Sequence, residues 1–121
     1  MIVYKVLHRK PNGRLESAIS AKPFCLKYGI NQVTKSKRGY GGILCFEDPD
    51  CAETFIKHME IWDHQLCMFE CLVNQKNRRR LPIKADVIKW DGQSSYGSGY
   101  WPEGTICFKQ IKVIRKYFLS T

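Results

Sequence analysis

The sequence predicts an α+β fold: a mainly antiparallel, curved sheet of roughly five or six strands with one main helix, about residues 49–61, on one face. Short apolar or alternating segments recur with turn residues between them, which is typical of antiparallel sheets. One segment has apolar residues at helical spacing. The length of 121 residues suits one domain with its own core, so residues 1–121 are assigned to a single domain. A small, partly open barrel is the alternative arrangement.

The N-terminal third predicts a hairpin followed by a basic loop. Residues 2–8 are rich in β-branched and aromatic side chains, as strands are. Asn12-Gly13 supplies the positive φ angles that a tight turn requires. Residues 14–20 then alternate, so they predict the second strand of the hairpin. A short strand is possible at 24–28, whereas 31–42, with several lysines and arginines, is expected to be an exposed loop.

The middle of the chain contains the strongest local signals. Residues 42–46 form a short continuous apolar run, which predicts a central strand. Asp48 is a good helix N-cap and Pro49 is favoured in the first turn. Four apolar residues then recur at positions i, i+3, i+4 and i+7, namely Ala52, Phe55, Ile56 and Met59. This spacing predicts a helix with one buried face.

The C-terminal half predicts strands separated by polar segments. Residues 65–73 indicate a second strong strand, which residues 74–82 interrupt. Residues 83–90 are expected to form another strand. Residues 91–104 predict a long loop, and loops of this length are usually functional or disordered. Residues 105–117 are expected to form one final alternating strand.

The charge balance favours an anionic partner. Lysine and arginine number 20 against 11 acidic residues, giving a net charge of +9, and the pI is about 9.4. This excess is compatible with a nucleic acid, a nucleotide or an acidic protein, although solubility alone is the alternative explanation. No segment approaches the roughly 18 apolar residues of a membrane span. The N-terminus lacks the order of a signal peptide, so a cytoplasmic location without membrane contact is expected.

The six cysteines predict reduced thiols rather than disulfides or a metal site. Most lie within apolar runs, where a free cysteine behaves as a small buried hydrophobic residue. Cys67 and Cys71 would lie about 13 Å apart on one strand. That separation is too large for a disulfide and prevents both sulfurs from reaching one zinc ion. Neither a metal nor a cofactor is predicted.

Two basic segments and one aromatic segment are the candidate binding residues. Arginine forks suit phosphate and carboxylate groups, and neighbouring aromatic rings can stack on bases. The predicted anion-binding residues are Lys35, Lys37, Arg38, Lys76, Arg78, Arg79, Arg80 and Lys84. The predicted stacking residues are Tyr96, Tyr100 and Trp101. The alternative is that the arginines form a solvated hairpin tip and that the aromatic side chains pack on the core. A separate basic cluster comprises Lys109, Lys112, Arg115 and Lys116.

The catalytic signals are sparse. Nucleophile-elbow, kinase and zinc-protease signatures are absent from the sequence. Glu70 lies between apolar neighbours on a predicted strand, and His8 is a possible partner for it. A carboxylate in this position is also what the outward face of an alternating strand provides. A non-enzymatic protein is therefore favoured, with Glu70 and His8 as the catalytic candidates.

Several short motifs along most of the chain resemble small uncharacterised proteins of bacteriophages and bacteria. The motifs are Tyr4-Lys5-Val6, Ser17-Ala18, Tyr28, residues 42–46, Ala52-x2-Phe55, Glu70-Cys71 and Trp101-Pro102-Glu103-Gly104-Thr105. The resemblance carries no known activity. It implies a mobile-element setting, in which short basic proteins inhibit or redirect host machinery.

A second resemblance is to the ADP-ribosyltransferase superfold. That family has Arg or His on its first strand, Ser or Tyr on a middle strand and a catalytic Glu on a later strand. His8 or Arg9, Tyr40 and Glu70 occur in this order. This chain is shorter, and it lacks the Ser-Thr-Ser-type motif and the paired glutamates. The resemblance implies Tyr40 as a further catalytic candidate.

Three hypotheses follow from these observations. The leading hypothesis is a phage-type accessory or inhibitor protein that binds an anionic partner without catalysis. The enzyme alternative is a nucleotide-dependent enzyme similar to a minimal ADP-ribosyltransferase, with Glu70 as its acid or base. The third is a structural subunit of a larger assembly.

Overall fold

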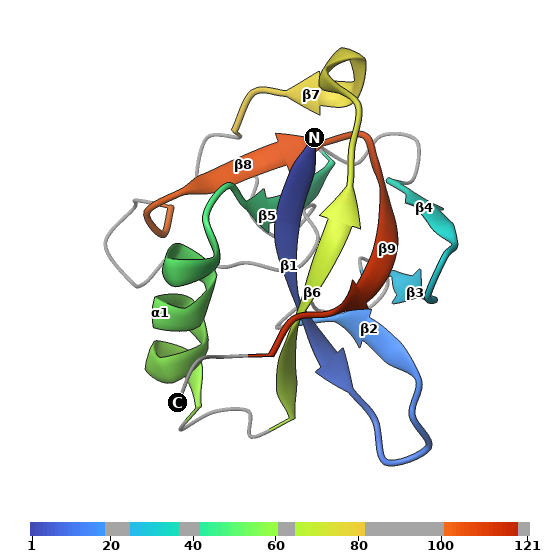
Figure 1. Ribbon diagram of the computed structural model, residues 1–121, viewed down its shortest axis with the longest axis vertical. Coiled ribbons are helices and arrows are strands. Elements are labelled where there is room, and N and C mark those ends of the chain that lie inside the picture. The colour runs from blue at the N-terminus through green and yellow to red at the C-terminus, as the bar shows by residue number, and fades with distance from the viewer. Residues whose placement is uncertain (19–24, 37–41, 61–64, 82–100, 119–121) are drawn as a thin grey trace.

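The computed structural model describes residues 1–18, 25–36, 42–60, 65–81 and 101–118, and these form one α-helix and one nine-stranded sheet (Figure 1). In chain order the elements are β1 (Ile2–Arg9), β2 (Leu15–Ser17), β3 (Lys27–Tyr28), β4 (Val33–Lys35), β5 (Ile43–Phe46), α1 (Pro49–Met59), β6 (Leu66–Leu72), the 3-10 helix η1 (Gln75–Asn77), β7 (Arg78–Arg79), β8 (Thr105–Phe108) and β9 (Gln110–Lys116). The predicted α+β class and its single main helix are confirmed. The strands outnumber the five or six expected because several are only two or three residues long.

The sheet is built around β1, and every strand pair in the described ranges is antiparallel. Its order is β4-β9-β6-β1-β5-β8-β7, with β2 pairing both β1 and β3. One edge of β1 pairs with β6 along its length, from Ile2 to His8. The other edge is shared, because Tyr4 pairs with β5 whereas Leu7 to Arg9 pair with β2. The sheet therefore divides along β1, which allows it to curve.

A corner at Lys109 divides the segment that was predicted to be one strand. Residues 105–108 pair with β5, whereas residues 110–116 pair with β6 and β4. Since β8 and β9 are consecutive in the chain but lie on opposite sides of β1 in the sheet order, the sheet bends round on itself. Figure 1 shows β8 crossing the upper end of the molecule before the chain turns down into β9.

Apolar side chains pack on both sides of the sheet. The interior cluster consists of Val3, Leu7, Leu15, Leu26, Tyr28, Ile43, Cys45, Phe69, Cys71, Val73, Ile106, Phe108, Ile111 and Val113. A second cluster lies between the sheet and α1 and consists of Val6, Ala18, Phe46, Ala52, Phe55, Ile56 and Met68. The alternation of side chains along the strands supplies one residue set to each cluster.

The helix forms as its sequence predicts. The Asp48 carboxylate accepts a hydrogen bond of 2.7 Å from the Asp50 amide, and Pro49 occupies the first turn. Ala52, Phe55 and Ile56 are buried against the sheet. This face, rather than intrinsic propensity, supplies most of the stability of so short a helix.

The first hairpin is confirmed, whereas the expected loop at 31–42 is partly wrong. The Gly13 amide donates to the Lys10 carbonyl at 2.8 Å, and Gly13 has a φ of +84° that suits glycine. Val33 to Lys35 form β4, because their backbone groups pair with β9. The strand predicted at 83–90 and most of the loop predicted at 91–104 lie outside the described residues.

Lys5 is an unexpected member of the interior. It lies between Val3 and Leu7 on the inward face of β1, and its side chain is 0% exposed. Its ammonium group donates a hydrogen bond of 2.5 Å to the Leu44 carbonyl. A buried charge requires such partners, because the transfer of an ammonium group out of water is costly.

The helix found in the described ranges, α1, is too short and too polar to cross a bilayer.

Candidate anion-binding site

Four of the predicted anion-binding residues lie together at one end of the molecule. The Asn74 side chain accepts a hydrogen bond of 2.9 Å from the Lys76 amide and so caps η1. Immediately afterwards, Arg78 and Arg79 pair with Phe108 and Cys107 of β8. The sheet thus fixes the backbone of the arginine run, while the side chains of Lys76, Arg78, Arg79 and Arg80 are exposed.

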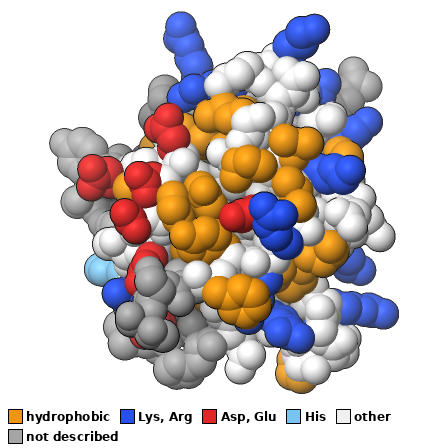
Figure 2. All heavy atoms as spheres, viewed as in Figure 1, with side chains coloured by type: hydrophobic (Ala, Val, Ile, Leu, Met, Phe, Trp, Pro, Cys, Tyr) orange, Lys and Arg blue, Asp and Glu red, His pale blue; other side chains and the backbone are white. Residues whose placement is uncertain are grey.

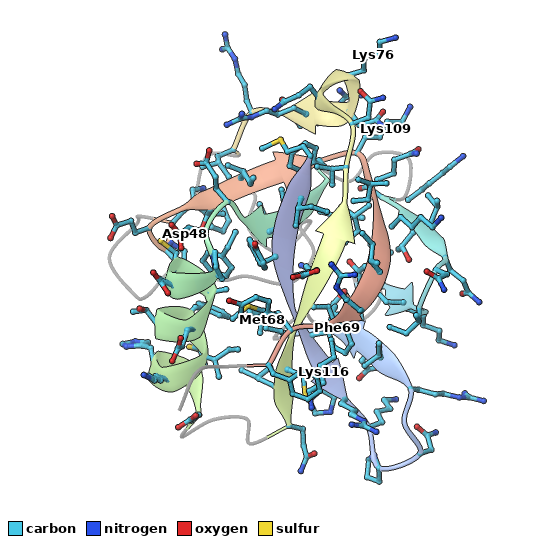
Figure 3. The ribbon with its side chains drawn as sticks, in the orientation of Figure 1. Asp48, Met68, Phe69, Lys76, Lys109 and Lys116 are labelled. Carbon is cyan, nitrogen blue, oxygen red and sulfur yellow. The ribbon has the colours of Figure 1, made fainter. Side chains whose placement is uncertain are left out.

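Lys109 joins three distant segments at this end. Its amide donates to the Asn77 carbonyl at 2.7 Å, and its carbonyl accepts from the Ser36 amide at 2.8 Å. These two bonds bring the corner between β8 and β9 against η1 and against the end of β4, which carries Lys35. Figure 3 shows Lys76 and Lys109 at the same upper end of the molecule. We call Lys35, Lys76, Arg78, Arg79, Arg80 and Lys109 the basic end.

The cations of the basic end are available to an external anion. None of the six is within ion-pair distance of a carboxylate among the residues that the structure places; the ion pairs found there join Lys10 to Glu16, Lys57 to Glu53 and Arg115 to Glu70. A groove of about 560 Å³ runs along the arginine segment, lined by residues 78–81 and by Thr105, Ile106 and Cys107. The groove suits an anion held by the three arginine side chains.

Opposite charges gather elsewhere on the molecule. Burial raises the pKa of the Cys51 thiol near the start of α1. The nearby carboxylates raise it further, namely those of Asp48, Glu103, Asp50 and Glu47. Figure 2 shows most acidic side chains on the α1 side of this face and most Lys and Arg side chains along the top and the opposite side. Charges separated in this way would favour the approach of an anion from the side of the basic end.

Several predicted binding residues lie outside the described residues, namely Lys37, Arg38, Lys84, Tyr96 and Tyr100. Trp101 is half-buried and precedes β8 by four residues. It is not among the described residues that line the groove beside the arginines. Stacking by the predicted aromatic set therefore stays a prediction.

The structure separates the catalytic candidates. Glu70 pairs with Tyr4 on β1, whereas His8 lies four residues farther along that strand, or about 13 Å at 3.3 Å per residue. Glu70 instead pairs with Arg115, whose Nε lies 2.6 Å from Glu70 Oε2. Burial, together with the charge of Glu70, raises the pKa of Tyr4. Tyr40 lies outside the described residues.

The cysteines are free thiols, and three of them, Cys45, Cys71 and Cys107, are buried. Cys67 and Cys71 both lie on β6, the arrangement that made a shared disulfide or zinc ion geometrically unfavourable. In the part of the chain that the structure describes, no three His, Cys, Asp or Glu side chains are arranged to hold a metal ion.

Alkaline pH should destabilise the fold through Cys71. Burial raises the pKa of this thiol above its ordinary value of 9.0, nearby Cys45 raises it further, and Lys5 opposes the shift. Above about pH 9.0 the thiol of the unfolded chain has lost its proton, whereas the folded chain retains it, so the free energy of unfolding falls as the pH rises. The expected loss is about 1.4 kcal/mol per pH unit for one thiol. Urea unfolding between about pH 8 and pH 10 measures it.

The matched control is Cys71→Ala, which lacks the titrating thiol. This variant should be less stable at neutral pH because the core loses volume, yet its stability should decline less steeply with pH. Equal slopes for the two proteins would contradict the assignment.

Two features of the candidate surfaces were not predicted from the sequence. Lys109 was assigned to a separate C-terminal cluster, but the corner after β8 brings it to Lys76 instead. A second hollow of about 800 Å³ lies at the opposite end of the sheet, where Lys10, Arg14 and Lys27 contribute to its lining. The basic residues in the first hairpin were the available signal for it.

The chain matches no protein-family model, and neither a curated protein nor a solved structure shows significant similarity to it.

Proposed function

We propose that the chain is a non-enzymatic binding module whose basic end engages a polyanion, with nucleic acid as the favoured class. The observation that carries the proposal is the meeting of three distant segments at Lys109, through the hydrogen bonds to Asn77 and Ser36. Those bonds place lysines and arginines from β4, η1, β7 and the β8–β9 corner on one surface. Convergence of this kind gives a positive field that isolated surface cations do not produce.

Nucleic acid is favoured because the cations come from several segments: three arginines line a groove, and Lys35, Lys76 and Lys109 lie on the neighbouring β4, η1 and β8–β9 corner. Arginine contributes two-pronged hydrogen bonds to phosphate, and lysine contributes a compact charge. A single nucleotide would occupy only part of such a surface. A polymer contacts several cations at once and displaces the counterions that surround its phosphates.

The mobile-element setting implied by the sequence motifs fits this proposal: a short basic protein of that kind would act as an accessory factor or inhibitor of host machinery. The enzyme alternative has less support, because Glu70 is paired with Arg115 and lies far from His8. A partner protein recovered with the chain from native extract, together with no affinity for nucleic acid, would favour the structural-subunit alternative.

Removal of two lysines from the basic end should weaken nucleic-acid binding and flatten its salt dependence. The Lys76→Ala/Lys109→Ala variant loses two exposed cations, so the slope of log K against log salt should fall by about 0.7 per lysine on a single strand. Fluorescence anisotropy with a labelled single-stranded oligonucleotide, from low to physiological salt, measures the slope.

Lys57→Ala is the control, because Lys57 is an exposed lysine on α1 paired with Glu53 at 3.2 Å. It removes one positive charge from the acidic side of the molecule and should leave the slope almost unchanged, compared with the loss of about 0.7 per lysine expected at the basic end. A wild-type binding curve that does not respond to salt would refute the proposed function.

A further inference from the structure

The outer face of the sheet is only partly covered by α1. The helix packs over Val6 of β1 and Met68 of β6. Farther along the same strands the cover is incomplete: Tyr4 is only half-buried at the margin of the α1 cluster, and Leu72 is 45% exposed. Figure 2 shows this region as an apolar surface with one acidic and one basic side chain near its centre.

A β-bulge places the end of β9 on this face. Cys71 pairs with Val113 and Glu70 pairs with Arg115, so Ile114 is an extra residue opposite β6. Val113 is buried in the interior, and simple alternation would send Arg115 inward as well. The extra residue reverses the alternation, so Arg115 reaches Glu70 on the outer face.

The same reversal brings Tyr117, two residues after Arg115, to the outer face beside Tyr4. The rings of Tyr4 and Tyr117 meet edge to face with centroids 5.4 Å apart. The Tyr117 amide donates to the Met68 carbonyl at 2.9 Å, which fixes the backbone beside β6. Phe118 follows with 79% of its surface exposed. We call Tyr4, Tyr117 and Phe118 the aromatic face.

The aromatic face is flanked by cations from β9. Lys112, Arg115 and Lys116 all lie on this strand, and Lys116 Nζ is 5.5 Å from the centroid of the Phe118 ring. Among the described residues of this face, Glu70 is the carboxylate, and Arg115 already neutralises it at 2.6 Å. The surface therefore combines one exposed ring, Phe118, and two half-buried tyrosine rings with excess positive charge, which complements a ligand that has both flat rings and phosphates.

The aromatic face and the basic end are connected by β9. Lys109 belongs to the basic end and Lys116 lies beside Phe118, which is a separation of seven residues or about 23 Å of extended strand. Lys112 and Arg115 lie between them along the strand. This distance is comparable with the track that a short single strand follows on a small β-sheet domain.

We propose that the aromatic face stacks on the unpaired bases of single-stranded nucleic acid while the cations of β9 contact its phosphates. The inference rests on the proposed function and names its substrate. Bases in a duplex are stacked on one another and cannot reach a protein ring, so the proposal requires a single strand. An acidic protein would form ion pairs with the cations but has no bases on which the aromatic rings could stack.

Phe118→Leu tests the proposal most directly, because the exposed ring contributes little to the core. Anisotropy should show oligo(dT) binding to the wild-type protein more tightly than a duplex of equal length. Phe118→Leu and Tyr117→Leu should each weaken oligo(dT) binding about tenfold. Phe118→Trp, which keeps an aromatic ring at this position, should bind oligo(dT) as tightly as the wild-type protein. Ile30→Ala removes an exposed apolar side chain from the hollow beside the first hairpin and serves as the control that should change nothing.

The outcomes distinguish this inference from the proposed function. If the leucine variants bind like the wild-type protein while Lys76→Ala/Lys109→Ala weakens binding, the aromatic face has no role and the basic end retains its own. Equal affinity for duplex and single strand, or affinity for polyglutamate that matches oligo(dT), would also overturn the base-stacking proposal. Absence of binding to every polyanion would refute both.

Discussion

Replacement of Lys5 by alanine should lower the free energy of unfolding by about 2–5 kcal/mol, the range seen when a long buried side chain is truncated. Lys5 is fully buried on the inward face of β1. Its aliphatic stem fills interior volume between Val3 and Leu7, and its ammonium group donates to the Leu44 carbonyl. The alanine variant loses both the packing and the hydrogen bond. Urea unfolding followed by circular dichroism measures the loss.

Lys5→Met separates the two contributions, because methionine keeps most of the stem and removes the charge. A buried charge replaced by an apolar group of similar volume is often neutral or stabilising. We therefore expect Lys5→Met to remain within about 1.5 kcal/mol of the wild-type protein. If methionine is as damaging as alanine, the hydrogen bonds of the ammonium group, and not its stem, stabilise the interior.

Phe55→Ala should destabilise the protein by about 3–5 kcal/mol. Phe55 is 0% exposed and lies between α1 and the sheet. Its ring centroid is 5.3 Å from that of Phe46 on β5, so the ring joins the helix to the centre of the sheet. Truncation would leave a cavity at this contact. Thermal and urea unfolding should both show the loss.

Thr54→Ala is the matched control, because Thr54 is exposed on the same turn of α1. Its hydroxyl donates to the Asp50 carbonyl at 3.0 Å, a local bond that helices can lose at little cost. The control should change stability by no more than about 0.5 kcal/mol. A loss below about 1.5 kcal/mol for Phe55→Ala would contradict the packing described for the helix.

The two proposed binding surfaces would account for the large positive charge of this small chain. With a net charge of +9, repulsion among the lysines and arginines opposes the compact fold. Lys109 of the basic end and the cations of β9 follow one another along the chain as far as Lys116, whereas Glu47, Asp48, Asp50 and Glu103 lie near Cys51 at the start of α1. A single strand bound along these cations would neutralise the repulsion among them.

Elements with local signals were predictable from the sequence. The helix followed from Asp48, Pro49 and the spacing of Ala52, Phe55 and Ile56, because capping and amphipathic periodicity act within a few residues. The first hairpin followed from Asn12-Gly13, since the turn alone brings its flanking strands together. The buried strands β5 and β6 followed from their apolar runs.

Features that depend on distant pairing were not predictable. Val33 to Lys35 form a strand because their backbone pairs with the edge of β9. That pairing is distant in the sequence, so the local pattern predicted a loop. The corner at Lys109 exists because residues 105–108 and 110–116 have different partners. Lys5 was not recognised as an interior residue, although its position between Val3 and Leu7 in an alternating strand was the available signal.

The sequence by itself determined the α+β class, the helix, the first hairpin and the excess of positive charge, because each depends on composition or on neighbouring residues. The tertiary structure alone decided which cations meet at the basic end and which side chains face outward from β9. The bulge at Ile114 shows the reason. One extra residue in a strand exchanges its two faces, and only the pairing with β6 fixes where that exchange occurs.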